Sequence, residues 1–397
     1  MRCRPDCWLS LRDSLSVSGR AFRTRDSQSE CQSRSDVTYG SRMNRFFWGN
    51  FDFEEQLRGD VQRSSRVERL VLELASCWLA VADADDRIWC PGELPFEFLE
   101  SLAQWELPSN LFVSDPRQIP HGMELVPWGW SPAAVEFGER QRLIVNAPPL
   151  DVVCLANSRE YSVPLEESPA DDWDYATLCR TLGQVLACVE RLPHMTAWVI
   201  KANWSHAARE RILGRGSQLT AADISWVKQR LARDGVVSWE RWLNRESEVG
   251  IQWHITPGQA PELIAITELL VDPRGQYAGT REMSLAVSTP EWAMQAAEST
   301  RPAVHDLANR GYFGPVGIDA MRYTHPDWNM ARTRPLQDIN ARWTMGRLAA
   351  GWFERIQSER PVTWWHGNRD SDVTAEWIAT SPDTINRAPV SHRTWLT

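Results

Sequence analysis

Short strand-like apolar runs alternate with stretches of helical periodicity along most of this chain. Apolar residues recur at helical spacing over 67–79 and 174–192, while compact apolar runs at 197–201, 249–255 and 263–271 are typical of strands. Helices and sheets in such an order bury their apolar faces against one another. The sequence therefore predicts an α/β (α+β) fold. With 397 residues, the chain is long enough for two or three domains.

Further elements follow from the same patterns. Thr220 is expected to cap a helix that ends before Gly235. Residues after about 360 show little periodicity and are expected to form a surface tail. The remaining predictions are an aromatic strand-like run at 44–53, strands at 88–90, 143–147, 152–155, 236–239, 315–321 and 335–340, and helices at 96–105, 291–298 and 302–310.

The first 42 residues differ from the rest. They are rich in serine and arginine and poor in aliphatic residues, so they are expected to be a disordered leader. The pattern changes at Met43, which is a candidate start of the gene product. The predicted domains are an N-terminal α/β domain over 43–157, a main domain over 158–350, and a C-terminal helix with a surface tail over 351–397.

Charge and hydropathy argue against two classes of partner. The chain has 43 Lys and Arg against 52 Asp and Glu, a net charge of −9, which disfavours nonspecific binding to nucleic acid or anionic lipid. The longest apolar stretch, 70–82, is too short to span a bilayer, and no apolar segment follows the N-terminal arginines as in a secretory signal. We therefore expect a cytoplasmic protein with no nucleic-acid or membrane partner, whose eight scattered cysteines are buried free thiols.

Lysine is rare, which makes its position informative. It occurs only at 201 and 228, and every other basic residue except histidine is arginine. Lys201 ends the apolar run AWVIK, and a basic, glycine-containing stretch that includes Arg209 follows it. A point charge at a strand end and a loop rich in arginine and glycine would suit phosphate groups, although a lysine extending from a strand end into water is the plainer alternative. The phosphate-loop motif of P-loop NTPases is absent.

A second polar pattern lies in the segment PLQDINAR, residues 335–342. Alternation along a strand places Asp338, Asn340 and Arg342 on one face, with Leu336 further back on that face and Ile339 opposite. Carboxylate and amide oxygens are ligands that Mg²⁺ prefers, and Asp319 in the strand-like segment GIDAM could join them. The alternative is that Asp338 and Asn340 cap a turn or pair with arginines.

The order of these features resembles the ATP-grasp superfamily. The resemblance covers about residues 150–350, and its most specific part is the segment DINARWTMG, 338–346. It implies an ATP-grasp fold of two α+β subdomains, preceded by an α/β pre-ATP-grasp domain. It also implies ATP and Mg²⁺ as cofactors, and small-molecule carboxylate and amine substrates. A homodimer is compatible with it.

The resemblance also implies roles for individual residues. Lys201 corresponds to the strand lysine that contacts the α- and β-phosphates, and Arg209 lies in the phosphate-covering loop. Glu240 would meet the adenine amino group and the backbone of Leu243 would read the ring. The full set of implied site residues is Lys201, Arg209, Glu240, Leu243 and either Glu246 or Glu248 for ATP, Asp319, Asp338 and Asn340 for magnesium, and Arg342, with Arg281 as a weaker candidate, for the acyl phosphate or substrate carboxylate.

Some positions depart from the family pattern. The family usually has glutamate where this chain has Asp338. No lysine precedes Lys201, so Arg159 is a candidate for an additional phosphate contact that family members commonly make with lysine. His206 is the one histidine near the covering loop.

The predicted function is an ATP- and Mg²⁺-dependent ligase. It would activate a carboxylate as an acyl phosphate for attack by an amine or thiol, and would release ADP and phosphate. The alternatives are a phosphotransferase of the same fold and a non-catalytic ATP-binding regulatory module.

Overall fold

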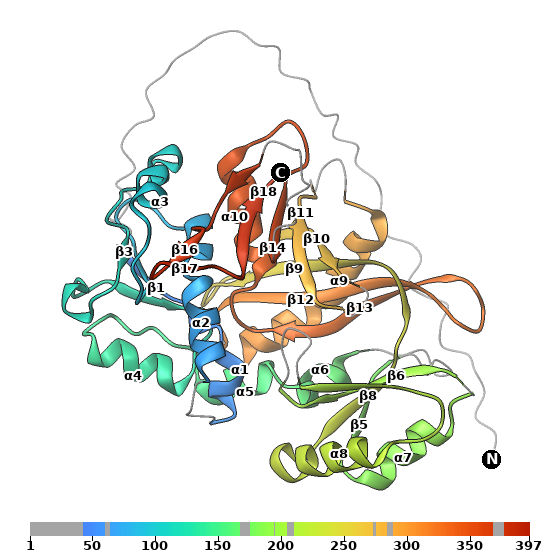
Figure 1. Ribbon diagram of the computed structural model, residues 1–397. Helices are drawn as coiled ribbons and strands as arrows, with labels where there is room; N and C mark the ends of the chain where they lie inside the picture. The colour runs from blue at the N-terminus through green and yellow to red at the C-terminus, as the bar shows by residue number, and fades with distance from the viewer. Residues whose placement is uncertain are drawn as a thin grey trace. The chain divides into compact units, whose positions relative to one another are not determined.

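The computed structural model describes residues 43–59, 64–166, 175–193, 195–204, 210–272, 275–283, 289–367 and 377–397 (Figure 1). The expected leader, residues 1–42, lies outside the described residues, as do Arg209 and His206. Residues Met43–Thr397 form one compact unit. The predicted α/β class is confirmed, because the unit combines one parallel sheet with antiparallel sheets and helices.

The N-terminal part is built on a parallel sheet with the strand order β3-β2-β1-β4. Its central strand β1 contains Phe46 and Phe47, both fully buried, as expected for a parallel strand covered on two faces. The elements of this part are β1 Arg45–Trp48, α1 Phe53–Leu57, α2 Ser65–Glu73, η1 Ala75–Ala80, β2 Arg87–Trp89, α3 Phe96–Ser101, η2 Leu102–Trp105, β3 Phe112–Val113, η3 Pro116–Gln118, β4 Glu124–Pro127 and α4 Pro132–Arg140.

Two helices, α5 Leu150–Ala156 and α6 Arg159–Leu165, connect this part to the next. The predicted strand at 152–155 is therefore wrong. Pro149 immediately precedes α5, and Asp151 lies in the first turn of the helix, where a negative charge is favourable. A short apolar run does not distinguish a strand from a helix. The predicted strand at 143–147 is reduced to one bridge between Ile144 and Glu124.

The middle part is a four-stranded antiparallel sheet with the order β5-β8-β6-β7. Figure 1 shows its two helices, α7 and α8, side by side on one face of the strands. Thr181 and Gln184 form a capping box that starts α7, and Thr220 and Asp223 start α8 in the same way. The elements are β5 Thr177–Cys179, α7 Leu182–Glu190, β6 Ala197–Ala202, β7 Arg211–Arg215, α8 Ala221–Asp234 and β8 Val237–Arg241.

Two predictions for this part have different outcomes. The helix capped by Thr220 and ended by Gly235 is confirmed, since Gly235 adopts φ 76°, the left-handed conformation of a helix end. The helix predicted over 174–192 begins only at Leu182, because residues Thr177–Cys179 pair with β8 as a strand. The capping box at Thr181 fixes that start.

The C-terminal part is an eight-stranded sheet with the order β13-β12-β9-β10-β11-β14-β18-β15. Helix α9 packs against β9, β12 and β13, and α10 packs against β10, β11 and η1 of the N-terminal part. The elements are β9 Asn244–Ile255, β10 Glu262–Val271, β11 Tyr277–Arg281, α9 Glu291–Asn309, β12 Gly314–Thr324, β13 Ala331–Asn340, α10 Met345–Ile356, β14 Thr363–Gly367, β15 Ile378–Ala379, the hairpin β16 Thr384–Ile385 and β17 Ala388–Pro389, and β18 Arg393–Leu396.

Helix α9 replaces the two helices predicted at 291–298 and 302–310. Pro302 lies inside it, but Ala303 and Leu307 continue the apolar face begun by Ala293 and Ala297. Burial of that continuous face maintains the helix across a residue that cannot donate a backbone hydrogen bond.

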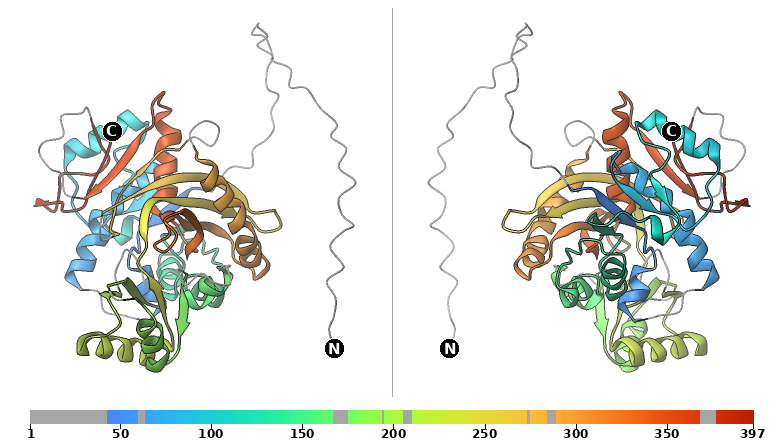
Figure 2. Two further views of the ribbon diagram at one scale, coloured as in Figure 1. Left: turned by 90° about the vertical axis from the view of Figure 1, so that its right-hand side faces the viewer. Right: turned by 90° about the vertical axis from the view of Figure 1, so that its left-hand side faces the viewer.

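The surface tail predicted after residue 360 is also wrong. Strand β14 pairs with β11 and β18, and Trp364, Trp395 and Leu396 are buried. These short strands lack a long periodic pattern, yet their backbones complete the ladder of the large sheet. In both views of Figure 2, the red C-terminal strands lie beside the blue and cyan N-terminal segments. Hydrogen bonds between Glu93 and Asn386 join the two.

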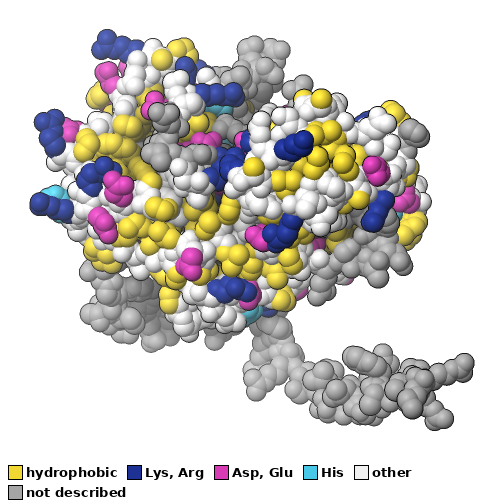
Figure 3. Space-filling view, turned by 90° about the horizontal axis from the view of Figure 1, so that it is seen from below, with side chains coloured by type: hydrophobic (Ala, Val, Ile, Leu, Met, Phe, Trp, Pro, Cys, Tyr) yellow, Lys and Arg dark blue, Asp and Glu magenta, His cyan; other side chains and the backbone are white. Residues whose placement is uncertain are grey.

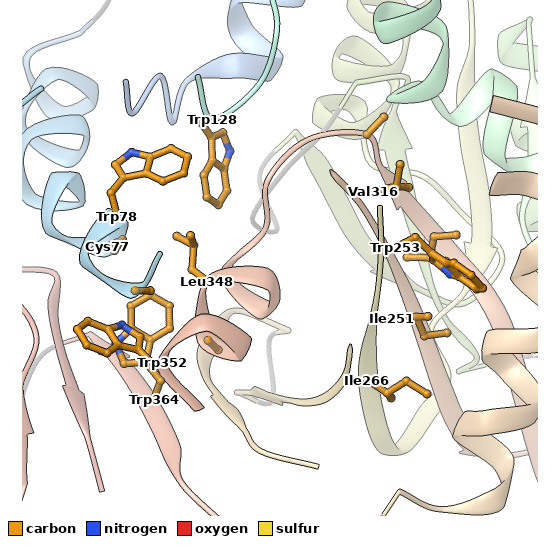
Figure 4. Packing of buried hydrophobic residues seen from close by; sticks show 14 of the residues in the cluster. Cys77, Trp78, Trp128, Ile251, Trp253, Ile266, Val316, Leu348, Trp352 and Trp364 are labelled. Atoms are coloured by element: carbon orange, nitrogen blue, oxygen red, sulfur yellow. The ribbon is translucent and has the colours of Figure 1, made fainter. Parts of the chain in front are cut away.

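Tryptophans account for much of the core. Figure 4 shows Trp78 and Trp128 from the N-terminal part close to Leu348 and Trp352 of α10, with Trp364 of β14 beside Trp352. The middle part has a separate core around α7, α8 and β6. The 22 tryptophans thus include large buried anchors that fill space between elements distant in the sequence.

The remaining general predictions concern thiols, membranes and charge. Cys77, Cys90 and Cys179 are buried free thiols, as predicted, whereas Cys154 and Cys188 are free thiols that are only partly buried. Among the residues that the structure describes, no helix has the length and apolar character needed to cross a bilayer. On the face shown in Figure 3, basic side chains lie among acidic and hydrophobic ones.

The core makes a testable prediction about α10. Trp352 is fully buried, so Trp352→Ala should lower the free energy of unfolding by about 3–5 kcal/mol. Trp328→Ala is the matched control, because that indole is 46% exposed and its removal should cost less than about 1 kcal/mol. Urea denaturation of the full chain measures both. Equal losses in the two variants would contradict the assignment of Trp352 to the core.

Candidate active site

A cavity of about 550 Å³ brings together side chains from the N-terminal part, the middle sheet and the large sheet. Its size is that of a pocket for a small organic ligand. One region is lined by cations and another by carboxylates and an amide. Its polar and aromatic lining includes Arg159, Lys201, Arg211, Glu240, Arg241, Trp242, Arg245, Glu248, Asp319, Arg334, Asp338, Asn340, Arg342, His366 and His392.

Lys201 enters this cavity from β6. The strand places Trp198, Val199 and Ile200 in the interior, and the lysine follows them with only 7% of its surface exposed. Burial lowers the pKa of Lys201, an effect that its ion pair with Glu240 on β8 opposes. The strand prediction for 197–201 is thus confirmed, but the lysine does not extend into bulk water.

Glu240 is the centre of a buried ionic cluster. It pairs with Lys201 and, at 2.6 Å, with Arg334 of β13. Burial alone would raise the pKa of Glu240, but the charges of Arg334 and Lys201 lower it below its ordinary value. Arg334 also pairs with Glu166 at the end of α6, with one contact at 2.8 Å. Because two cations already engage its carboxylate, Glu240 is placed to orient Lys201, and its contact with an adenine amino group stays a prediction.

Arg159 connects the cationic and acidic regions of the cavity. It begins α6, its backbone N–H donates to the carbonyl of Asn203 at 3.0 Å, and its side chain is buried. Its Nη2 donates to Oδ2 of Asp338 at 2.9 Å. It also lies close enough to Lys201 to oppose that residue's charge. Arg159 therefore lies near Lys201. This position is compatible with the sequence-based prediction that Arg159 makes the additional phosphate contact for which family members commonly use a lysine.

The acidic residues lie on two neighbouring strands of the large sheet. Asp319 of β12 is the register partner of Asp338 on β13, and Gly317 is the partner of Asn340. Nδ2 of Asn340 lies 3.5 Å from Oδ2 of Asp319. Thus the structure brings the three predicted magnesium ligands together at one place on the sheet.

A register shift corrects the prediction for Leu336. Between the pairs 319–338 and 321–334, β13 uses more residues than β12, so strict alternation is interrupted. Leu336 consequently packs with Ile339 in the large core instead of lying on the face of Asp338. The same irregularity leaves Arg334 at the cavity.

Asp319 lies close to other negatively charged side chains. Burial, together with the negative charges of Asp338 and Glu248, raises the pKa of Asp319 to about 7. Such a carboxylate would be stabilised by a cation, and the two carboxylates suit a hard divalent ion. Asn340, however, turns its Nδ2 towards Asp319 while its Oδ1 accepts from Arg342, and Asp338 accepts from Arg159, so the alternative of pairing with arginines is also present. In the part of the chain that is described, no group of three or more His, Cys, Asp or Glu side chains could hold a metal; this candidate has two carboxylates and one amide.

Arg342 also lies at the cavity, held by several contacts. Its Nε donates to Glu54 at 2.7 Å, one terminal nitrogen donates to the carbonyl of Trp343, and the other donates to Oδ1 of Asn340 at 2.9 Å. The guanidinium lies 5.4 Å from the ring centre of Trp128. These contacts use three of its five N–H groups, which leaves donors for an anionic ligand.

The segment after β8 supplies an apolar and aromatic wall. Leu243 packs with Met321 and Tyr323, and both Leu243 and Met321 line the cavity. Of the two glutamates considered for ribose, Glu248 lines the cavity and pairs with Arg245 at 2.9 Å. Glu246 instead accepts a hydrogen bond from Thr324 at 2.5 Å and does not line the cavity.

Arg281 lies away from this cavity. It forms an exposed ion pair with Glu268 at 3.0 Å, so the surface alternative considered for it agrees with its position. Arg209 lies outside the described residues, but Arg211 from the same basic stretch lines the cavity.

Sequence reasoning missed several cavity residues. The guanidinium groups of Arg211 and Arg245 lie 5.2 and 5.1 Å from the ring centre of Trp242. Arg334 was missed because its partners are far away in the sequence, and His392 because the C-terminal strands were not expected. The arginine richness of residues 209–215 was the one signal that pointed to Arg211.

Comparisons with known proteins found similarity only to solved structures. No family model matches the sequence, and no curated protein matches it. Among solved structures, the chain is similar to N5-carboxyaminoimidazole synthetase from Staphylococcus aureus, with 9% identity, a TM-score of 0.49, and coverage of 89% of this chain and 93% of that one. It is also similar to biotin carboxylase from Campylobacter jejuni in complex with β-γ-ATP, with 10% identity, a TM-score of 0.46, and coverage of 69% and 70%.

A third similar structure is described as an ATP-grasp superfamily protein, from Archaeoglobus fulgidus. It has 10% identity and a TM-score of 0.44, over 88% of this chain and 98% of that one. Similarities this weak carry no argument about this chain, so the function proposed below rests on the side chains of the cavity.

The raised pKa of Asp319 makes a prediction with a defined sign. Because its folded pKa of about 7 lies above the ordinary value of 3.8, the fold favours the protonated form. The contribution of Asp319 to stability is full below the ordinary pKa and is lost as the pH rises through 7. Asp319→Asn cannot ionise, so the ligand-free variant should melt above wild type at about pH 8, and the difference should vanish toward about pH 4.

Thermal unfolding at the two pH values checks this prediction. Asp327→Asn is the matched control, because the hydrogen bond and charge of Arg241 lower the pKa of Asp327, and removing that carboxylate should give no gain at about pH 8. A melting temperature of Asp319→Asn at or below wild type at about pH 8 would show that Asp319 is not destabilised by its neighbours.

Proposed function

We propose that this protein is an ATP- and magnesium-dependent ligase that activates a carboxylate as an acyl phosphate and transfers the acyl group to an amine or thiol. The observation that carries the proposal is the convergence in one cavity of Lys201 and Arg159 with Asp319, Asp338 and Asn340. A polyphosphate with its cation needs both kinds of group, since arginine and lysine bind phosphate oxygens and carboxylates bind the metal.

The cationic region suits the nucleotide phosphates. Burial and the neighbouring charge of Arg245 lower the pKa of Arg211, so an anion placed there would relieve repulsion between like charges. Lys201 is held at the same region by Glu240, and Arg159 lies between Lys201 and Asp338. The apolar side chains of Leu243 and Met321 would face the base.

The chemistry proposed for the site needs positioning and charge neutralisation. A carboxylate oxygen of the substrate attacks the γ-phosphorus, the bond from phosphorus to the β,γ-bridging oxygen breaks, and ADP leaves with the electron pair. Lys201 and Arg159 would hold the phosphates in line, and the free N–H groups of Arg342 would orient the carboxylate. Magnesium bound by Asp319, Asp338 and Asn340 would neutralise charge on the phosphates.

In the second step, the amine nitrogen or thiol sulfur attacks the acyl carbon. The bond from that carbon to the phosphate oxygen breaks, and inorganic phosphate leaves with the electron pair. No residue needs to form a covalent intermediate, so the cavity requires no nucleophilic serine or cysteine.

The two lysines of the chain give a matched test of nucleotide binding. Lys201→Ala should weaken ATP binding about tenfold or more, because a charge-assisted contact to phosphate is lost. Lys201→Arg should restore little, since the planar guanidinium does not fit the buried position beside Glu240. Isothermal titration measures the affinities, with Lys228→Ala on the exposed face of α8 as the control. Unchanged affinity in both Lys201 variants would remove Lys201 from the site.

The reaction class can be tested without knowing the acceptor. Wild-type protein with ATP, Mg²⁺, a carboxylate library and hydroxylamine should form a hydroxamate together with ADP, because the γ-phosphoryl is the group transferred. Asp338→Asn should abolish both products while the fold is retained, as checked by circular dichroism. Release of AMP and pyrophosphate, or a phosphorylated product stable to hydroxylamine, would overturn the ligase proposal.

A further inference from the structure

The cavity is also lined by side chains that the proposed phosphate chemistry does not use. His366 of β14 and His392, just before β18, line it together with Leu70 and Leu74 near the C-terminal end of α2. The region exists because the C-terminal strands lie against the N-terminal part. It is therefore a second chemical environment within the same cavity.

His392 is held by a buried carboxylate. Glu73, only 3% exposed, accepts hydrogen bonds at Oε2 from the backbone N–H of His392 at 3.0 Å and from its Nδ1 at 2.9 Å. At Oε1 it accepts from the backbone N–H of Ser391 at 3.1 Å and from Nε of Arg69 at 2.7 Å. Four donors thus fix this carboxylate, and the carboxylate fixes the imidazole.

These contacts determine which imidazole nitrogen carries the proton. Burial would raise the pKa of Glu73, but the hydrogen bonds from Arg69, His392 and Ser391 together lower it, so Glu73 is an ionised acceptor. An ionised acceptor beside Nδ1 of His392 requires a hydrogen on Nδ1. The neutral imidazole then has its lone pair on Nε2. The ring itself is half exposed, at 50%.

His366 keeps the neighbourhood free of additional positive charge. Burial, together with the charge of His392, lowers the pKa of His366 to about 3, so its imidazole is neutral near pH 7. The ring packs edge-on against Trp364 and Tyr277. Its Nε2 has no hydrogen-bond partner among the described residues.

We propose that His392, oriented by Glu73, is the general base that takes the proton from the acceptor amine. The inference rests on the proposed ligase function, in which a protonated amine must lose a proton before it can attack. Nε2 accepts one proton from the ammonium group, and the freed nitrogen lone pair forms the bond to the acyl carbon. The bond from that carbon to the phosphate oxygen breaks with its electron pair on the phosphate, which takes the second proton that the nitrogen loses. The charged groups around His392 are Glu73 and Arg69 of α2, with Arg66 also at the cavity, while His366 of β14 is neutral.

The decisive experiment compares two kinds of nucleophile. Hydroxylamine is largely unprotonated at neutral pH and needs no base, whereas ammonium and methylammonium do. In the carboxylate-library assay with ATP and Mg²⁺, His392→Gln should lower the ratio of amide to hydroxamate about 100-fold relative to wild type. Glutamine can still donate to Glu73, so the fold should be preserved. His305→Gln, at an exposed position on α9, is the matched control and should leave the ratio unchanged.

Each outcome of that assay has one meaning. An unchanged ratio in His392→Gln would overturn the proposal, and so would an equal fall of both products, because a structural role would impair the first step as well. Absence of hydroxamate and ADP from the wild-type reaction would overturn the ligase function itself, and this inference with it. A selective loss of amide supports the base assignment.

A second measurement does not depend on any substrate. In the full chain labelled with ¹⁵N-histidine, the signals of His392 are identified by their loss in His392→Gln. The neutral ring should be the Nδ1–H tautomer, because Glu73 accepts from Nδ1. Observation of the Nε2–H tautomer would overturn the proposal, since Nε2 would then have no lone pair to accept a proton.

Discussion

The buried guanidinium of Arg334 is the interaction on which the geometry of the cavity depends. Arg334 is 1% exposed and pairs with two carboxylates, Glu166 at the end of α6 and Glu240 on β8. Removing a charge from water costs several kcal/mol, and the cost is offset only when paired groups surround it. The three residues come from the connection after the N-terminal part, the middle sheet and the large sheet. The ion pairs among Arg334, Glu166 and Glu240 therefore fix the positions of these three regions relative to one another.

Lys201 and Asp338 depend on this arrangement. Glu240 pairs with Lys201 as well as Arg334, so the position of the lysine follows from that of the arginine. Arg159 connects the same neighbourhood to Asp338. Around Asp319 the balance is reversed, because its nearest charged neighbours include Asp338 and Glu248. The charges of Arg334, Glu240 and Lys201 are thus neutralised by pairing, which stabilises the fold. Asp319 instead lies among like charges that lower the stability of the empty site and would favour binding of a cation.

Local signals in the sequence predicted local structure well. The apolar run before Lys201, the capping residue Thr220 and Gly235 at the helix end are each decided within a few residues, and the structure confirms them. The segment around Asp338 was also recognisable as a strand, because its partners in β12 carry a similar pattern. The ligand roles assigned to these residues remain predictions, since no sequence pattern fixes what a side chain contacts.

The errors have a common physical origin in distant contacts. The strands after residue 360 are stabilised by backbone bonds to β11 and to one another, which leave no periodic pattern in a short segment. The register shift in β13 depends on its pairing with β12, so alternation alone placed Leu336 on the wrong face. Arg334 was missed at the cavity because its partners Glu166 and Glu240 lie far from it in the sequence.

The separate hydrophobic cores of the large sheet and the middle sheet explain why polar contacts between these two regions are important. One hydrophobic core joins the N-terminal part to the large sheet, while the middle sheet and its helices have a core of their own. Across the boundary, the described contacts include Arg334 with Glu240, Arg241 with Asp327 at 3.1 Å, and the hydroxyl of Tyr175 with the carbonyl of Thr333 at 3.3 Å. Polar contacts are directional and sensitive to nearby charge, whereas a shared apolar core is neither. An anion bound between Lys201 and Arg159 would act on this boundary directly, so the same charges that hold the two regions together are those that a nucleotide would engage.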